Sequence, residues 1–297
     1  MTDRSFRCSD ASEAEGEPLF GTASTITNWF LVEHPGPWGE EALRHARLPA
    51  GLGDVLRHRE RELNIRVLLI RRHGRRTGAR RSCFAVHTGP DRPWMERVDL
   101  KDVRDVAALD LDRLGRGASV GLTPFEDALF AVCTHGRRDP CCAERGRPLA
   151  SALSQAFPEQ TWESAHIGGD RFAGNMIAFP HGFYFGRVDP GRGVEVATGY
   201  TAGTIDLRHL RGRCCRPTDV QAAEHHLRVR HALTGIDDVT VVHISRAGPD
   251  TFATFRTPLG SYRVGVRREL GPEEQLTCHS EAMHRPPRSV LLAIEEA

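Results

Sequence analysis

Lysine is almost absent from this 297-residue chain: Lys101 is the only one, and arginine supplies nearly all of the positive charge. The formal net charge is +1, so no strong field of one sign favours nucleic acid or a membrane surface as a partner. The chain has no run of eighteen apolar residues, so we expect no membrane-spanning helix. Its first residues are polar and acidic, without the basic and apolar regions of a signal peptide, so we expect a cytoplasmic protein.

Several signatures of common enzymes are also missing. No Gly-x-Gly-x-x-Gly follows a strand-like segment, so there is no nicotinamide or flavin fingerprint. No pair of carboxylates stands in a context that argues for glycoside hydrolysis. The compact Cys-x-x-Cys that lowers the pKa of a thiol at a helix start is absent as well. If the protein catalyses a redox reaction, we therefore expect it to take electrons from a separate reductase.

Eight cysteines are present, and in a reducing compartment we expect no structural disulfide framework among them. Metal binding, thiol chemistry or burial remain. Cys83 lies in an alternating strand pattern and is expected in the core, and Cys278 is expected to be buried. Cys8 lies in a polar start and is expected to be incidental. Two adjacent pairs are harder to dismiss: Cys141-Cys142 and Cys214-Cys215.

Two motifs combine thiols, imidazole and flexible backbone within about forty residues. The first is Cys133-Thr-His-Gly-Arg-Arg-Asp-Pro-Cys-Cys142, and the second is His166-Ile-Gly-Gly-Asp-Arg-Phe-Ala-Gly-Asn175. Each follows an apolar, strand-like segment, and ligands bind at the carboxyl ends of strands in α/β sheets. Soft sulfur and imidazole are the donors that an iron–sulfur or other metal site needs.

Hydrophobic periodicity divides the chain into a disordered start and three segments. The start is 1–19, and the segments are 20–118, 119–200 and 201–297. In the first segment we expect strands at 28–33, 65–70 and 83–87 and helices at 40–48, 53–63 and 102–114. The second repeats this plan, with strands at 128–133, 161–165, 176–179 and 183–188 and a helix at 147–156. In the third we expect a helix at 221–233 and antiparallel strands at 239–244, 251–255, 261–266 and 289–293.

The ordered set of motifs resembles the sucraseferredoxin-like family, whose members are similar to thioredoxin-like ferredoxins. The resemblance implies an α/β (α+β) fold, with a thioredoxin-like [2Fe–2S] ferredoxin domain preceded by a degenerate thioredoxin-like unit and followed by a helix plus antiparallel sheet. Besides the two motifs, it is carried by Trp162-Glu, by Pro180-His-Gly-Phe-Tyr-Phe-Gly-Arg187 and, more weakly, by Trp29-Phe-Leu-Val-Glu-His-Pro-Gly-Pro-Trp-Gly39 and Val220-Gln-Ala-Ala-Glu224.

The resemblance also implies a set of cluster ligands. The family's two thiolates fall on Cys133 and Cys142, and its first histidine falls on His166. Where the family's characterised variant has a second histidine, this chain has Asp170. A ferric-rich cluster accepts oxygen donors, so Asp170 is our candidate for the fourth ligand. Four cysteines stay open as alternatives: Cys141, Cys214, Cys215 and Cys278.

Some of these residues also have a purely structural interpretation. Asp170 could instead pair with Arg171 or cap the following helix. His135 is expected to support the loop rather than to bind metal, and Trp162 is expected in the core. The motif then leaves three function classes open. They are a [2Fe–2S] electron-transfer or redox-responsive protein, which we favour, a thioredoxin-like thiol-disulfide oxidoreductase, and a zinc-binding structural module.

A basic stretch from Arg71 to Arg81 holds six arginines. It is expected to be either a solvated hairpin tip, which we favour, or a docking surface for an acidic redox partner, such as a reductase or an electron acceptor. The sequence shows no aromatic interleaving that would indicate nucleic-acid binding. The first segment, which lacks the motif cysteines, is expected to shield the cluster or to form the contacts of a homodimer.

Overall fold

A ten-stranded sheet runs through the molecule in the computed structural model, which describes residues 5–74 and 78–297. Its strand order is β10-β9-β8-β6-β7-β2-β1-β3-β4-β5. The strands are β1 (Asn28–Glu33), β2 (Arg66–Arg71), β3 (Arg81–His87), β4 (Trp94–Leu100), β5 (Thr123–Pro124), β6 (Leu129–Cys133), β7 (Thr161–Ser164), β8 (Met176–Phe179), β9 (Phe183–Phe185) and β10 (Leu210–Arg213).

The strand order repeats within this sheet. In one half, β1 and β2 are parallel, and β3 and β4 continue antiparallel from β1. In the other half, β6 and β7 are parallel, and β8 and β9 continue antiparallel from β6. The two halves join where β2 pairs antiparallel with β7, with Ile70 opposite Ser164. The strands come from all three predicted segments, since β10 lies after residue 200, so the sheet is continuous across residues 118 and 200.

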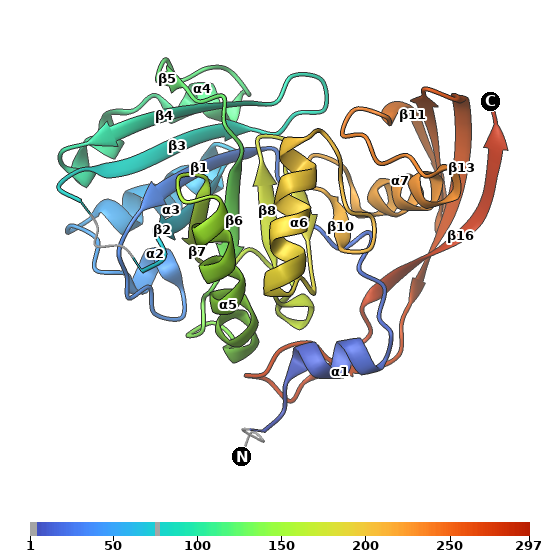
Figure 1. Ribbon diagram of the computed structural model, residues 1–297, viewed down its shortest axis with the longest axis horizontal. Helices are drawn as coiled ribbons and strands as arrows, with labels where there is room; N and C mark the ends of the chain where they lie inside the picture. Colours follow the sequence, from blue (N-terminus) through green and yellow to red (C-terminus); the bar gives the residue numbers. More distant parts are fainter. Residues whose placement is uncertain (1–4, 75–77) are drawn as a thin grey trace.

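Helices connect the parallel strands, as parallel pairing requires. Between β1 and β2 lie the short α2 (Ala42–His45) and α3 (Leu52–Glu62), and between β6 and β7 lies α5 (Pro140–Ala156). In place of the single helix predicted at 102–114 there are a 3₁₀ helix, η1 (Val103–Ala108), and α4 (Leu111–Gly115). Another helix, α6 (Pro190–Thr201), packs beside α5 on one face of the sheet (Figure 1).

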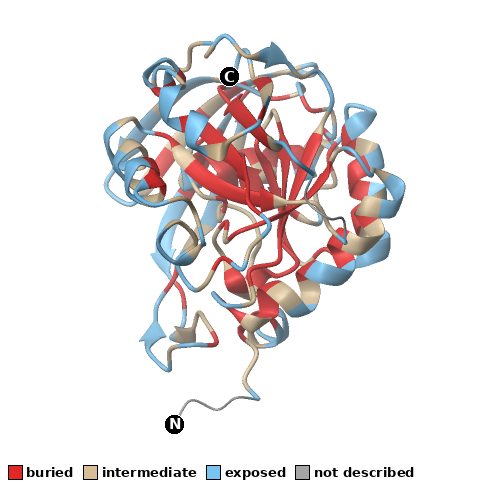
Figure 2. Ribbon diagram, turned by 90° about the vertical axis from the view of Figure 1, so that its left-hand side faces the viewer, coloured by how far each residue is buried: buried red, intermediate tan, exposed pale blue. Residues whose placement is uncertain are grey.

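The apolar core lies on both faces of the large sheet. Phe130 and Val132 point toward α5 and α6, where they pack with Leu149. Trp29 and Trp162 belong to a second, larger cluster. Figure 2 shows the strands as the buried centre of the molecule, with the exposed faces of the helices outside. The expectation that Trp162 lies in the core is confirmed, because it is 1% exposed.

The C-terminal segment forms a separate four-stranded antiparallel sheet. Its order is β11-β12-β13-β16, and α7 (Thr218–His231) packs on one face through Ala223 and Leu227 (Figure 1). The strands are β11 (Thr240–Ala247), β12 (Asp250–Thr257), β13 (Gly260–Leu270) and β16 (Pro287–Glu296). The predicted helix and the four predicted strands of this segment are confirmed.

The N-terminal helix packs against a loop of the C-terminal segment, whereas the C-terminus itself lies far from that helix (Figure 1). The N-terminal stretch was expected to be disordered, but it contains a helix, α1 (Cys8–Ala14). This helix lies beside the C-terminal segment in Figure 1. That segment includes a small hairpin of β14 (Glu274–Gln275) and β15 (Met283–His284), and Cys278 lies in its loop. Cys8 is fully buried, and its amide and its sulfur both contact the Cys278 sulfur. It is therefore not incidental.

The basic stretch does not form a hairpin tip, because β1 lies between β2 and β3 in the sheet. The stretch instead crosses from one side of β1 to the other, and residues 75–77 lie outside the described part of the chain. Two of its arginines bind within the molecule. Arg71 pairs with Glu163 at 2.6 Å, and the Arg72 guanidinium stacks on the Trp162 ring with 3.8 Å between guanidinium carbon and ring centroid.

Candidate metal centre

The first motif places two thiols face to face by a strand–loop–helix turn. Cys133 is the last residue of β6, and Cys142 lies in the first turn of α5. Asp139 caps this helix by accepting a hydrogen bond from the Cys141 amide at 2.9 Å, and Pro140 occupies its first position, where no amide hydrogen is needed. The cap fixes where the helix starts, and so where Cys142 points.

The second motif adds an imidazole and a carboxylate from the loop after β7. Gly168 and Gly169 have φ of 93° and 79°, in the left-handed region that favours glycine. The turn brings His166 Nδ1 to 3.0 Å from an Asp170 carboxylate oxygen, and the same oxygen accepts from the Cys142 thiol at 3.1 Å. The candidate ligand atoms of Cys133, Cys142 and His166 lie within 4.8 Å of one another.

The four side chains of the candidate site shift one another's pKa values. Hydrogen bonds from Cys142 and then from His166 lower the pKa of the Cys133 thiol well below its usual value, despite complete burial. The neighbouring Cys133 in turn raises the pKa of Cys142. Burial acts to lower the pKa of His166, but Asp170 and Cys133 outweigh it and raise that pKa to about 9. Ligands that must lose protons bind metal more tightly as the pH rises.

Neighbouring groups fix the histidine and its loop. His135 Nδ1 accepts a hydrogen bond from the His166 amide at 3.1 Å, and its Nε2 lies 2.6 Å from the Gly39 carbonyl oxygen. This arrangement suits a neutral ring that accepts at Nδ1 and donates at Nε2, and burial lowers the pKa of His135 accordingly. His135 therefore supports the loop, as expected.

Arg211 is a supporting residue that the sequence did not reveal. Its guanidinium is buried and donates to the Gly168 carbonyl at 2.9 Å and to the Asn175 side-chain oxygen at 2.8 Å. Asn175 donates to the Gly169 carbonyl at 2.7 Å, so the carbonyls of both glycines are held by hydrogen bonds. Arg211 lies on β10, outside both motifs, and no local sequence pattern pointed to its role.

The cysteines that were alternative ligands lie elsewhere. Cys141 points away from Cys142 and contacts Cys8 and Cys278. The Cys214 sulfur lies 3.3 Å from the Thr88 hydroxyl. Asp170 contacts Cys142 and His166, and not Arg171, which pairs with Glu17 at 2.8 Å. Cys215 lines a different pocket, beside Arg216.

The candidate site is closed toward the sheet and open toward solvent on one side. Cys133 and Cys142 are each 1% exposed, whereas the His166 side chain is 22% exposed. His166, His135 and Arg138 line a pocket of about 270 Å³ that also carries carboxylates and guanidiniums from α2, α3 and β2.

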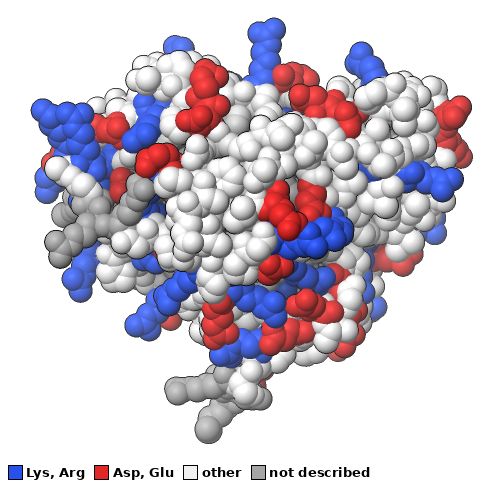
Figure 3. All heavy atoms as spheres, in the orientation of Figure 1, with Lys and Arg blue, Asp and Glu red and all other residues white. Residues whose placement is uncertain are grey.

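Acidic and basic side chains are interspersed over the face seen in Figure 3, in keeping with the small net charge. No helix in the described parts of the chain is long and apolar enough to cross a membrane.

Comparison with known proteins agrees with the motifs. A segment of 74 residues is 32% identical to "Altered inheritance of mitochondria protein 32" of Meyerozyma guilliermondii, and it covers 22% of this chain and 26% of that protein. The match therefore spans about a quarter of the relative's length. No solved structure matches the chain. The model of the sucrase/ferredoxin-like family matches residues 19–211, which include both motifs and Arg211. This match covers more than half of the chain, which therefore belongs to the sucrase/ferredoxin-like family.

Proposed function

We propose that the chain is a [2Fe–2S] electron-transfer or redox-responsive protein, and that Cys133, Cys142, His166 and Asp170 hold the cluster. The observation that carries this proposal is the convergence of these four buried or half-buried donors from two loops. They fall into a thiol pair, Cys133 with Cys142, and an imidazole–carboxylate pair, His166 with Asp170. Two donors for each of two irons is the division found in clusters with mixed ligands.

The strand order supports a thioredoxin-like frame for this site. The order β9-β8-β6-β7, with α5 between the parallel strands and α6 after β9, is the arrangement of a thioredoxin-like unit. The β2-β1-β3-β4 half has the same order without the motif cysteines, which supports its interpretation as a degenerate copy. Such a frame presents the end of β6 and the start of α5 at one edge, where the thiols lie.

A bound [2Fe–2S] cluster would supply the uptake and release of one electron. The residues around it would set how that electron enters and leaves. Cys133 and Cys142 lie beneath the surface and exclude water, and His166 is the candidate ligand nearest to the solvent pocket. Replacing thiolate by imidazole removes negative charge and raises the reduction potential relative to a four-cysteine cluster. A carboxylate at Asp170 offsets part of that rise, because it restores one negative charge.

Anaerobic purification followed by measurement of iron, acid-labile sulfide, zinc and the visible spectrum tests the proposal. We expect two irons and two sulfides per chain and bleaching on reduction. Cys133→Ser and His166→Ala should lose most of the iron, and Asp170→Ala should change the spectrum or the potential. Ser164→Ala is a matched control, because this buried hydroxyl has no hydrogen-bond partner among the described residues and lies next to the site.

Other outcomes would favour the competing functions. Colourless protein without iron under anaerobic conditions contradicts the cluster. If that protein reduced disulfides with a dithiol as electron source, the thiol oxidoreductase would take its place. One zinc lost on Cys133→Ser would favour the structural module. An Asp170→Ala variant with unchanged iron, spectrum and potential would remove Asp170 from the ligand set.

For the partner, we propose an acidic reductase or electron acceptor that docks at the basic stretch. Arg80 is exposed there, whereas Arg71 and Arg72 are engaged with Glu163 and Trp162. Arg80→Glu should then slow electron exchange with the partner at low salt and leave the cluster unchanged. An exchange rate that does not respond to this charge reversal or to salt contradicts docking at this stretch. We propose a cytoplasmic location for the pair.

A further inference from the structure

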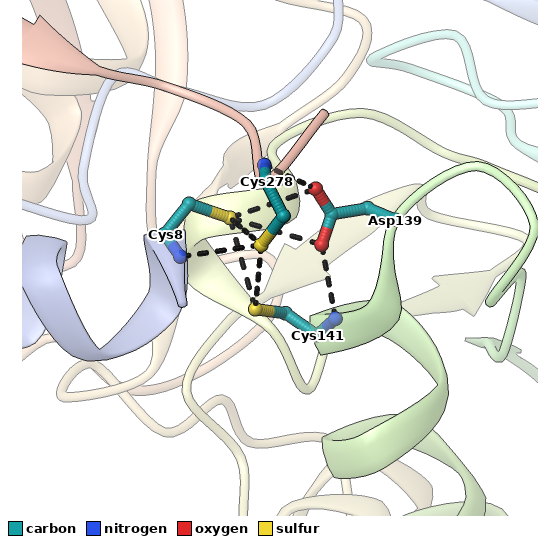
Figure 4. Close-up of side chains that lie close together, drawn as sticks. All are labelled: Cys8, Asp139, Cys141 and Cys278. Carbon is teal, nitrogen blue, oxygen red and sulfur yellow. Dashed lines mark hydrogen bonds between the residues drawn. The ribbon is translucent and has the colours of Figure 1, made fainter. Parts of the chain in front are cut away.

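A second group of thiols lies on the other side of the α5 start from the candidate cluster. Cys8, Cys141 and Cys278 point toward one another, and Asp139 closes the group (Figure 4). The sulfurs of Cys8 and Cys141 are 3.8 Å apart, those of Cys8 and Cys278 are 3.5 Å apart, and those of Cys141 and Cys278 are 3.4 Å apart. All four side chains are buried, with exposed fractions of 8% or less.

The size of this sulfur triangle fits a single tetrahedral ion. With zinc–sulfur bonds of about 2.3 Å, two thiolates at tetrahedral corners lie about 3.8 Å apart. The three observed separations are equal to that edge or slightly shorter. A multi-iron cluster distributes its thiolates over separate iron atoms and so holds them farther apart. Sulfur-rich tetrahedral sets of this kind favour zinc among the common divalent ions.

Asp139 is placed to be the fourth donor. One of its oxygens, Oδ2, accepts from the Cys278 amide at 2.8 Å and from the Thr277 hydroxyl at 3.0 Å. The other, Oδ1, accepts from the Cys141 amide at 2.9 Å. A carboxylate has about four lone-pair sites. The two amides and the hydroxyl occupy three of them, which leaves the fourth for the Cys8 thiol or, once that thiol has lost its proton, for a metal ion. The Cys8 sulfur lies 3.8 Å from Oδ1, close to the edge of the same tetrahedron.

Asp139 caps α5, and no positively charged group is among its hydrogen-bond partners in the described residues. The groups that hydrogen-bond to Asp139 are amides, a hydroxyl and a thiol, all of them neutral. A buried carboxylate without a cation beside it is costly. The Cys278 sulfur also accepts a hydrogen bond from the Cys8 amide at 3.4 Å, a contact that suits a metal-bound thiolate.

We propose that Cys8, Cys141, Cys278 and Asp139 form a mononuclear zinc site, separate from the site of the motif residues. Binding releases the thiol protons and leaves a compact four-ligand centre. The site joins α1, the loop between β14 and β15, and the first turn of α5. Cys141 binds zinc while the next residue, Cys142, faces Cys133, so the ion fixes the turn that presents Cys142.

Elemental analysis of the full chain and of matched cysteine variants tests this site. We expect one zinc per wild-type chain. Cys8→Ser and Cys278→Ser should each reduce bound zinc at least tenfold, and Cys133→Ser should lose iron while it keeps zinc. Cys214→Ser is the control for a buried thiol outside both groups, and it should keep both metals. Because the two metals respond to different variants, loss of the proposed iron site would leave this result unchanged.

A second measurement uses the wild-type chain alone, so it holds even if the cysteine variants fail to fold. Iodoacetamide labelling followed by mass spectrometry should find Cys8, Cys141 and Cys278 protected together, and a zinc chelator should expose all three at once. Cobalt(II) in place of zinc should give the visible bands of a tetrahedral thiolate complex. A chain without zinc after purification with zinc supplied, or a disulfide among these three cysteines in fresh protein, would overturn the proposal. Zinc content unchanged in both Cys8→Ser and Cys278→Ser would overturn it as well.

Discussion

Replacing Gly146 with alanine should push α5 away from β6 and loosen the thiol pair. Gly146 lies four residues after Cys142, on the same face of the helix. An added Cβ would stand 2.0 Å from the Cys133 carbonyl oxygen and 3.5 Å from the Thr134 Cα. These are backbone atoms of the strand end, which cannot rotate out of the way. The missing side chain is therefore what lets the helix approach the strand that carries Cys133.

Two opposing terms set the size of the effect. Overpacking against a rigid neighbour costs about 3 kcal/mol, the upper part of the usual range. Alanine recovers about 1 kcal/mol, because glycine is a poor helix former. We therefore expect Gly146→Ala to lower the free energy of unfolding by about 2 kcal/mol. At a denaturant slope of about 3 kcal/mol per molar urea, the midpoint should fall by roughly 0.7 M.

Urea unfolding, together with iron content, measures this prediction. Gly199→Ala is the matched control, because Gly199 lies inside α6 and an added Cβ there approaches only Thr204, at 3.1 Å from its hydroxyl oxygen and 3.7 Å from its carbonyl oxygen. The control should be neutral or slightly stabilised. The Gly146 variant should also retain less iron, since Cys133 and Cys142 would no longer meet. A Gly146→Ala midpoint equal to or above wild type would refute the spacing argument.

Two further predictions concern buried charges. Glu224→Gln should lower the free energy of unfolding by about 3 to 5 kcal/mol, because it leaves the fully buried Arg228 without its carboxylate partner. The control Glu195→Gln changes an exposed ion pair and should cost little. Equal losses in thermal or urea unfolding of the two variants would contradict this prediction. Burial lowers the pKa of both His181 and His225 to about 4, below the 6.5 of a free ring. The unfolded chain then binds more protons between pH 6.5 and 4, so stability should be lost as the pH falls through that window, by up to about 3 kcal/mol per histidine. His181→Gln and His225→Gln should flatten this acid loss, and an unchanged pH profile would contradict it.

Much of the fold could be predicted from local patterns. The strands at 28–33 and 83–87 are apolar runs bounded by turns, and they form β1 and β3 almost residue for residue. The helix expected at 40–48 shrinks to α2, and residues 102–114 break at Leu109, because short amphipathic patterns do not fix where a helix ends. The pairing of β2 with β7 joins strands about ninety residues apart, and no local pattern encodes that contact.

The candidate site was predictable where residues lie close in sequence. The two motifs named Cys133, Cys142, His166 and Asp170, and the structure brings those side chains together. The second thiol group was not predicted, because Cys8 and Cys278 are 270 residues apart and meet only when α1 packs against the loop between β14 and β15. A cysteine in a polar terminal segment gives no periodic signal of burial.

The pairing of β2 with β7 also decides which part of this protein can be made alone. A chain that began after residue 118 would keep β6 to β9 but leave β7 as an open edge with unpaired amides and carbonyls. Trp162 on that strand would lose its contacts with Arg72 and Phe84 and face solvent. Open, apolar edges of this kind recruit strands from other molecules. The half without the motif cysteines thus acts as a built-in cap against self-association, and a minimal domain cut from the motif half should aggregate.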